Sequence, residues 1–289
     1  PPTLLLAIDS LGVRSTLVDE VSRRLEPKYH IPRESIALTY SHSHTTPKVS
    51  GVCDNIFSQP IPEPHQAHID RYTGELTDAL ERAAIAALED LRPGRLEWGV
   101  GQLALAMNRR TPGGPVDHDL PVLVVRGEDG SARAIYLSYA CHCVTLSHNK
   151  ISGDWAGFAQ ESIERRHPGC LALVSIGAGS DSNPVSGVVN DRVDVATAQG
   201  EEMATEVDRL LQQPLRPIAG RIAAQLATIQ LPLNEPPTRE KLTTLAAAGG
   251  PEGYNASTQL ARLDRGEELL KAIDYPVQSF ALRDGLLLV

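Results

Sequence analysis

Two histidines separated by one residue follow an apolar, β-branched run in the segment IALTYSHSHTTP, residues 36–47. On an extended chain, residues i and i+2 point to the same face, so the imidazoles of His42 and His44 share one face. Both can bind one metal ion, or one can bind the ion while the other contacts a substrate. The pair would also fit a surface loop. Its place at the end of a predicted strand, where sites gather in α/β folds, favours a functional site.

A second apolar strand runs into a histidine in the segment YACHCVTLSHNKISGDWAGFA, residues 139–159. His142 repeats the arrangement of the first pair, which predicts one site shared with His42; a purely structural histidine is the alternative. His148 and Asp154 follow in the loop. A structural alternative for Asp154 is the N-cap of a helix that begins at Trp155.

A glycine-rich turn, SIGAGSDSNP at residues 175–184, is the third candidate. Its glycines let the backbone approach a ligand, and successive N–H groups could hold an oxyanion. Ser180 and Ser182 allow a nucleophile, although the pattern GxSxG is absent, and an ordinary turn explains the composition equally well. Arg109 lies at another predicted strand end. Asp9 could orient a ligand histidine or cap the following segment.

Strands alternate with helices along the chain. This mixture of βα units and hairpins predicts one α/β (mixed α+β) domain over residues 1–289, with a β-sheet core flanked by helices. The predicted strands are residues 3–9, 35–40, 96–106, 121–139 (a hairpin), 171–176, 218–232 and 277–289. The predicted helices are residues 15–25 (N-cap Ser15), 66–91, 155–167, 190–213, 238–247 and 256–272. The helix at 66–91 shows one apolar face, made of Ile69, Tyr72, Leu76, Leu80, Ala83, Ala87 and Leu91.

The composition is ordinary for a globular protein with a core, with 42% hydrophobic and 22% charged residues. The net charge of −9 disfavours nucleic acid or anionic lipid as a partner. No apolar run approaches the ~20 residues of a membrane-spanning helix, so no transmembrane segment is predicted. Both ends read as interrupted strands, so we expect a piece of a longer protein, truncated at both ends.

Four cysteines are too few for a disulfide framework, which favours a reducing compartment such as the cytoplasm. Cys141 and Cys143 flank His142 and leave a cysteine zinc site conceivable. Such a C-x-C pair is a weak signal beside the C-x-x-C pairs of zinc ribbons.

Five stretches, in this order, resemble the neutral/alkaline (non-lysosomal) ceramidase family: LLLAIDSLG, ALTYSHSHTTP, MNRRTP, YACHCVTLSHNKISGDWAGFA and GAGSDSNP. The resemblance spans nearly the whole chain. Members of that family are zinc amidases that hydrolyse the N-acyl bond of ceramide. The resemblance therefore implies Zn²⁺ as cofactor, a small-molecule N-acyl or lipid-like substrate, and a fragment of the N-terminal catalytic domain of a divergent bacterial-type member.

The same resemblance implies a role for each matching residue. His42 and His142 would be zinc ligands. His44 would line the site beside the metal as a catalytic residue. Arg109, with Asn108 in the same Asn-Arg segment, would bind the substrate.

Three departures from the family pattern affect the interpretation. Asp181 matches the aspartate of the family's glycine-rich turn, but Asn183 stands where true ceramidases have an important serine, so a substrate other than ceramide stays open. The loop after the histidine pair reads TTPKVSG in place of the family's Ser-Gly-Pro run. The family's remaining zinc ligands, a glutamate and a tyrosine, would follow Val289.

These departures still allow hydrolysis by water. A zinc ion with an open position lowers the pKa of bound water toward ~7, which favours an activated water over a covalent serine. Asp181 and Asn183 are expected catalytic residues, and Asn183 or the turn N–H groups would stabilise the oxyanion.

Other classes of protein remain as alternatives. One is a metal-dependent hydrolase of esters or phosphates on the same scaffold. Another is a catalytically inactive binding protein, which the missing serine and the aromatic content of only 4% support. A TIM-barrel amidohydrolase would need a regular βα repeat that the sequence lacks, and the metallo-β-lactamase pattern H-x-H-x-D-H fails at Thr46 and Pro47.

Overall fold

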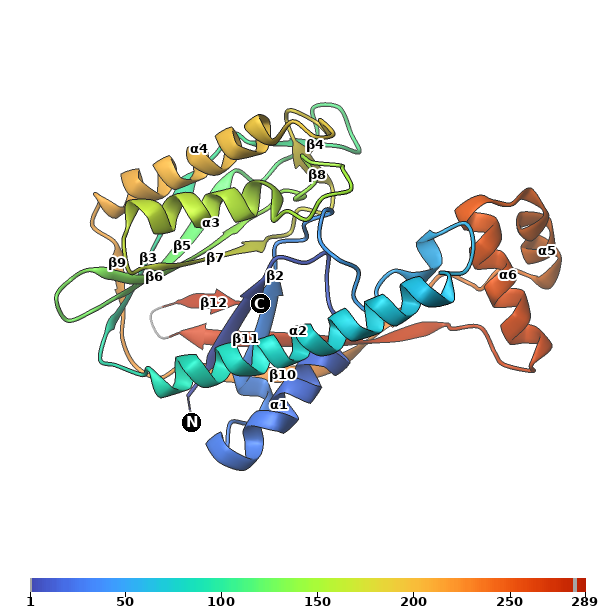
Figure 1. Ribbon diagram of the computed structural model, residues 1–289, viewed down its shortest axis with the longest axis horizontal. Helices are drawn as coiled ribbons and strands as arrows, with labels where there is room; N and C mark the ends of the chain where they lie inside the picture. Colours follow the sequence, from blue (N-terminus) through green and yellow to red (C-terminus); the bar gives the residue numbers. More distant parts are fainter. Residues whose placement is uncertain (1, 283–284) are drawn as a thin grey trace.

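A five-stranded sheet forms the largest layer of the structure, a computed structural model that describes residues 2–282 and 285–289. Its strands are β3 (Arg95–Gln102), β5 (Asp119–Arg126), β6 (Ala132–Tyr139), β7 (Leu171–Ile176) and β9 (Arg216–Ile218). Their order is β7-β6-β5-β3-β9, with β6 and β7 parallel and the other neighbours antiparallel. The predicted α/β class with a sheet core is confirmed (Figure 1).

Helices α3 (Asp154–Arg166) and α4 (Val193–Leu211) cover one face of this sheet (Figure 1). Burial alternates along β5, so that its even-numbered apolar residues enter the core beneath the helices. The two helices approach closely at Gly200, where a Cβ atom would lie 2.6 Å from the backbone nitrogen of Ala159. This core therefore depends on a residue without a side chain.

A second hydrophobic core lies around the parallel pair β1 (Leu4–Ile8) and β2 (Ile36–Tyr40). Helices α1 (Ser15–Tyr29) and α2 (Glu63–Glu89) pack on it, and short 3₁₀ turns, η1 (Arg33–Ser35) and η2 (Asp54–Ile56), lie in the connections. Arg24 of α1 joins the helices through Asp78 and Glu81 of α2. Strand β2, which precedes His42 and His44, thus belongs to a different hydrophobic core than β6, which precedes His142.

An antiparallel pair, β10 (Ala223–Pro232) and β11 (Ala272–Leu282), extends from the main body as an arm. Helices α5 (Arg239–Ala248) and α6 (Gly250–Asp264) lie at its far end (Figure 1). Strand β12 (Leu286–Leu288) pairs with β11 at the body end. The Gln278 amide of β11 donates to the carbonyls of Glu34 and Ile36, which ties the arm to the start of β2.

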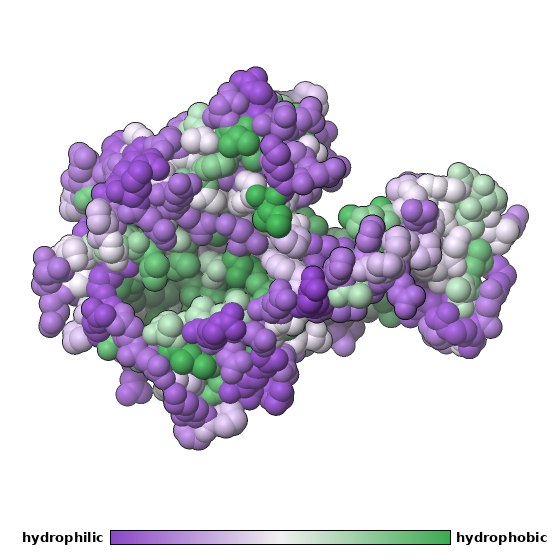
Figure 2. Space-filling view, in the orientation of Figure 1, coloured by the Kyte–Doolittle hydropathy of each residue, from purple (hydrophilic) through white to green (hydrophobic). Residues whose placement is uncertain are grey.

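The sheet face opposite α3 and α4 borders an apolar cleft of about 370 Å³. Trp98 and Tyr136 of the sheet line it on one side, and residues 286–289 line it on the other. Figure 2 shows this cleft as a hollow with hydrophobic walls, between the five-stranded sheet and the C-terminal strands.

A short antiparallel pair, β4 (Ala106–Asn108) and β8 (Ser182–Pro184), was not predicted. The predicted strand 96–106 ends at Gln102, and β8 lies within the glycine-rich turn. This pair is what brings the Asn-Arg segment against that turn.

Two helix predictions are wrong in detail. Ser15 is the first residue of α1, Arg14 is the cap residue, and no side chain caps this end. Ala83 and Ala87 of α2 are exposed, as is Leu91, which lies beyond the end of the helix, whereas Ala84 and Leu88 are buried. The buried stripe continues from Leu80 in steps of four residues, which keeps it facing α1 and β1.

The C-terminal boundaries were also wrong. Helix α6 covers residues 250–264, not 256–272, because Pro251 starts it and Gly266, with a φ of +77°, follows its end. The predicted strand 218–232 is divided into β9 and β10 at Gly220, whose φ is +98°. The predicted strand 277–289 is two strands, β11 and β12, and residues 283–284 lie outside the described residues.

Within the described part of the chain, we find no helix with the length and apolar character needed to span a membrane. All four cysteines are free.

We expect Leu137→Ala in β6 to lower the free energy of unfolding by about 2–5 kcal/mol, because Leu137 is 0% exposed and the substitution leaves a cavity. Leu171→Ala in the adjacent β7 is the control, since Leu171 is 65% exposed, and should cost less than about 0.5 kcal/mol. Urea denaturation measures both. Equal losses would contradict the assigned packing of the sheet.

Candidate metal centre

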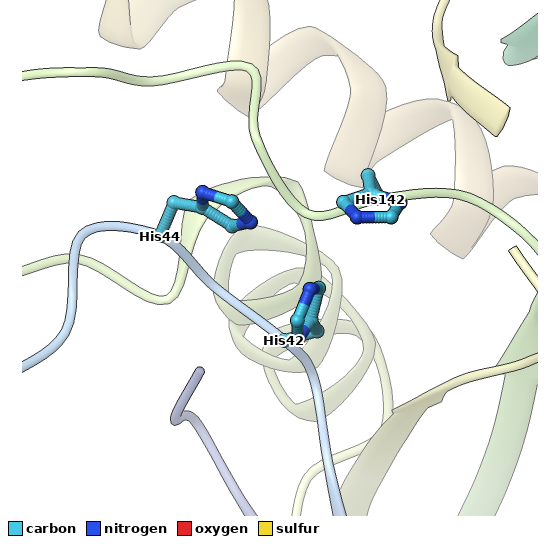
Figure 3. Close-up of side chains that lie close together, drawn as sticks. All are labelled: His42, His44 and His142. Carbon is cyan, nitrogen blue, oxygen red and sulfur yellow. The ribbon is translucent and has the colours of Figure 1, made fainter. Parts of the chain in front are cut away.

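Three imidazoles from two loops meet at one point (Figure 3). His42 and His44 follow the end of β2, and His142 follows the end of β6. One potential ligand atom from each residue lies within 4.8 Å of those of the other two. The ring centroids are 4.8 Å apart for His42 and His142, 5.1 Å for His42 and His44, and 5.8 Å for His44 and His142. The structure thus brings together the three histidines that the sequence singled out.

Main-chain carbonyls orient two of these rings. Nδ1 of His42 lies 2.6 Å from the carbonyl oxygen of Leu11, and Nδ1 of His142 lies 2.8 Å from that of Gly179. A carbonyl only accepts, so each Nδ1 carries the proton, and the Nε2 of the neutral ring keeps its lone pair. Metal-binding histidines in proteins show this arrangement. Nothing in the sequence marks Leu11 as an acceptor, because its contribution comes from the main chain.

His44 occupies the exposed side of the cluster, and its backbone N–H donates to the carbonyl of Cys143 at 3.1 Å. Partial burial, together with the charges of His42, His142 and Arg109, lowers the pKa of His44 to about 4. Burial also lowers the pKa of His142. Neutral imidazoles are the form that a metal ion accepts.

The cysteines beside His142 face the other way. Cys141 and Cys143 are fully buried in the core beneath α3 and α4, and burial raises the pKa of both thiols. A cysteine ligand must be a thiolate, which this environment disfavours. The structure therefore argues against the cysteine zinc site that the C-x-C pattern left conceivable.

Two non-glycine residues near the cluster have left-handed backbone conformations. The φ angle is +61° at His42 and +55° at Asp154. Such strained residues persist where surrounding contacts hold them, often at functional sites. Asp154 is the first residue of α3, and the N-cap is Gly153. The N-cap role considered for Asp154 from the sequence is therefore wrong by one residue. Its buried carboxylate accepts from the N–H groups of Leu146 and Trp155, at 2.8 and 2.6 Å.

The other predicted site residues form a second group around β4 and β8. The Asn108 amide donates to a carboxylate oxygen of Asp181 at 3.1 Å. The Arg109 guanidinium donates to the Ser180 carbonyl at 2.8 and 3.1 Å and to Oδ1 of Asn183 at 3.5 Å. Arg109 is also close enough to lower the pKa of His44. Asn108 and Asp181 thus hold the segment together, while Arg109 and Asn183 lie on its exposed side.

The glycine-rich turn packs against the His142 segment. The N–H of His142 donates to the Ser182 carbonyl at 2.9 Å, and a Cβ atom on Gly179 would lie 2.5 Å from the backbone nitrogen of Cys141. Gly179 therefore lets the turn approach the backbone of Cys141, whereas the sequence predicted that the glycines would let it approach a ligand. The N–H groups of Gly177, Gly179 and Ser182 already donate to protein carbonyls, which removes them as oxyanion donors.

Asp9 does not make the predicted contact with a candidate ligand: the acceptor for His42 is Leu11. The carboxylate of Asp9 instead accepts from the Gln160 amide of α3 at 3.2 Å. Burial raises the pKa of Asp9. The residue therefore ties the loop after β1 to α3.

Comparisons with known proteins support the fold. No protein-family model and no curated protein matches the sequence. Two solved structures match the whole fold with a TM-score of 0.70 each: the crystal structure of neutral ceramidase from Pseudomonas aeruginosa, 17% identical, and a ceramidase complexed with C2, 16% identical. The matches cover 97% of this chain but only 52% and 54% of those chains, so this chain spans about half their length. The chain therefore has a ceramidase-like fold.

We expect the metal-free protein to lose stability as the pH falls from 6.5 toward about 4. The folded state holds His44 neutral below its ordinary pKa, so the unfolded chain binds more protons and acid favours unfolding. This contribution is present above pH 6.5 and disappears as the pH falls through the folded pKa of about 4. Thermal unfolding across this range measures it. His44→Gln should reduce the pH dependence, and His68→Gln, on the exposed side of α2, should not; identical profiles for wild type and His44→Gln would contradict the assignment.

Proposed function

We propose that this chain forms the metal site of a zinc-dependent hydrolase that cleaves an amide (N-acyl) bond with an activated water. The observation that carries the proposal is the convergence of three imidazoles, with one potential ligand atom from each within 4.8 Å of those of the other two. The ceramidase-like fold supports the reaction class. Imidazole nitrogens suit zinc, and the carbonyls behind His42 and His142 supply the outer contacts that orient such ligands.

His42 and His142 would hold the metal, and His44 would face the substrate from the exposed side. When bound, zinc supplies a Lewis acid and lowers the pKa of water toward ~7. Arg109 and Asn183 offer N–H donors to a substrate oxygen that gains negative charge. Asp181 would act through Asn108, by holding the segment that carries Arg109. The expected substrate is a small N-acyl, lipid-like molecule.

Elemental analysis tests the metal site. We expect about one zinc per chain in the wild type, because His42 and His142 converge on one site beside His44 and imidazole nitrogens are ligands that zinc prefers. His42→Ala and His142→Ala should lose it. His68→Ala, which removes an exposed imidazole of α2, is the control and should retain it. A wild-type chain without zinc, after incubation with zinc and dialysis, would overturn the proposal.

A substrate panel tests the reaction. Matched N-acyl amide, ester and phosphate compounds are offered to the zinc-loaded chain, with His42→Ala beside it. Amide hydrolysis that is lost in the variant is expected. Turnover of only the ester or the phosphate would assign another metal-dependent hydrolase, and zinc binding without turnover of any compound would assign a binding scaffold.

A further inference from the structure

The segment of residues 41–45, which carries His42 and His44, also has a buried face. Along SHSHT, residues 41–45, the imidazoles alternate with hydroxyl side chains. His42 and His44 face the metal centre, whereas Ser43 is 0% exposed and Thr45 is 6% exposed. The pattern H-x-H therefore comes with a row of buried hydroxyl groups on the opposite face of the same segment.

Both hydroxyls donate to one atom in the other loop. Oγ of Ser43 lies 2.8 Å, and Oγ1 of Thr45 lies 2.9 Å, from the carbonyl oxygen of Ser152. The N–H of Ser152 in turn donates to the carbonyl of Thr45 at 2.9 Å. Three hydrogen bonds thus join two segments that are more than 100 residues apart in the chain.

Ser152 lies in the same loop as His142, just before α3. This loop is tied to the histidine pair at both ends: Cys143 accepts from the N–H of His44, and Ser152 accepts from the two hydroxyls. The positions of all three imidazoles relative to one another therefore depend on contacts between these two loops.

We propose that Ser43 and Thr45 are positioning residues that set the distance from His42 and His44 to His142, and so set the affinity of the centre for its metal. The inference rests on the proposed metal site. A carbonyl oxygen accepts two hydrogen bonds, and here it accepts one from each hydroxyl. Metal ligands must be held within about 0.5 Å of their working geometry, and buried hydrogen bonds such as those from Ser43 and Thr45 can hold them there.

Thr45→Val and Thr45→Ser separate the hydroxyl from the rest of the side chain. Valine keeps the branched shape and removes the donor, whereas serine keeps the donor. We expect Thr45→Val to weaken zinc binding about 10–100-fold, as loss of outer contacts to a metal site does, and Thr45→Ser to stay close to wild type. Competition with a chelating dye at pH 7.5 measures the zinc Kd.

The matched control is Thr77→Val. Thr77 is also buried, and its hydroxyl donates to the Thr73 carbonyl within α2, away from the centre. This variant tests general destabilisation and should leave the zinc Kd unchanged. A zinc Kd in folded Thr45→Val equal to that of the wild type would overturn the inference, as would equal weakening in Thr77→Val.

Hydrogen exchange of the metal-free protein separates this inference from the proposed function. The N–H groups of Ser152 and His44 cross between the loops, so Thr45→Val should raise their exchange rates and Thr45→Ser should not. If the wild type binds no zinc, the proposed function fails while this comparison still decides the role of the hydroxyl. Unchanged exchange rates in Thr45→Val would show that the hydroxyl does not position the loops.

Discussion

Two loops that rise from separate hydrophobic cores must satisfy each other's backbone groups where they meet, because water cannot reach all of them. The bond from the His44 N–H to the Cys143 carbonyl is the central instance. On one side, β2 is fixed by the core around α1 and α2; on the other, β6 is fixed by the core beneath α3 and α4. The imidazole cluster lies where the loops from these two cores meet.

Charged groups lie on two sides of the junction between these loops. Arg109 places a positive charge on the exposed side, and burial, with Arg109 as a smaller cause, lowers the pKa values of His44 and His142. The acidic groups Asp9 and Asp154 lie behind, buried, with pKa values raised by burial. Their carboxylates accept hydrogen bonds from the Gln160 amide or from backbone N–H groups, and so they hold the loops in place.

Sequence patterns predicted the parts of this architecture that depend on periodicity. The sheet, most helices and the three histidines follow from apolar runs that end in polar residues, and β7 was predicted with its observed bounds. Contacts made by main-chain atoms have no such signal, so the acceptor roles of Leu11, Gly179 and Ser152 could not be predicted. The pairing of β4 with β8 was missed because strands of three residues carry too short a pattern. The hydroxyl row in SHSHT could not be assigned a role from the sequence, because its acceptor is a main-chain carbonyl more than 100 residues away.

Main-chain carbonyls behind the imidazoles leave the residue types at their positions free to vary. Every residue provides a carbonyl, so a substitution at position 11 leaves the acceptor for His42 in place, provided the chain keeps its path. Quite different sequences can therefore build the same course of the main chain, which is compatible with a similar fold at 17% identity and a TM-score of 0.70. Constraint falls instead on the few positions where a side chain or its absence matters, such as Gly179, where a methyl group would collide with the backbone of Cys141. Such a centre is therefore better recognised by the course of its main chain than by the types of its residues.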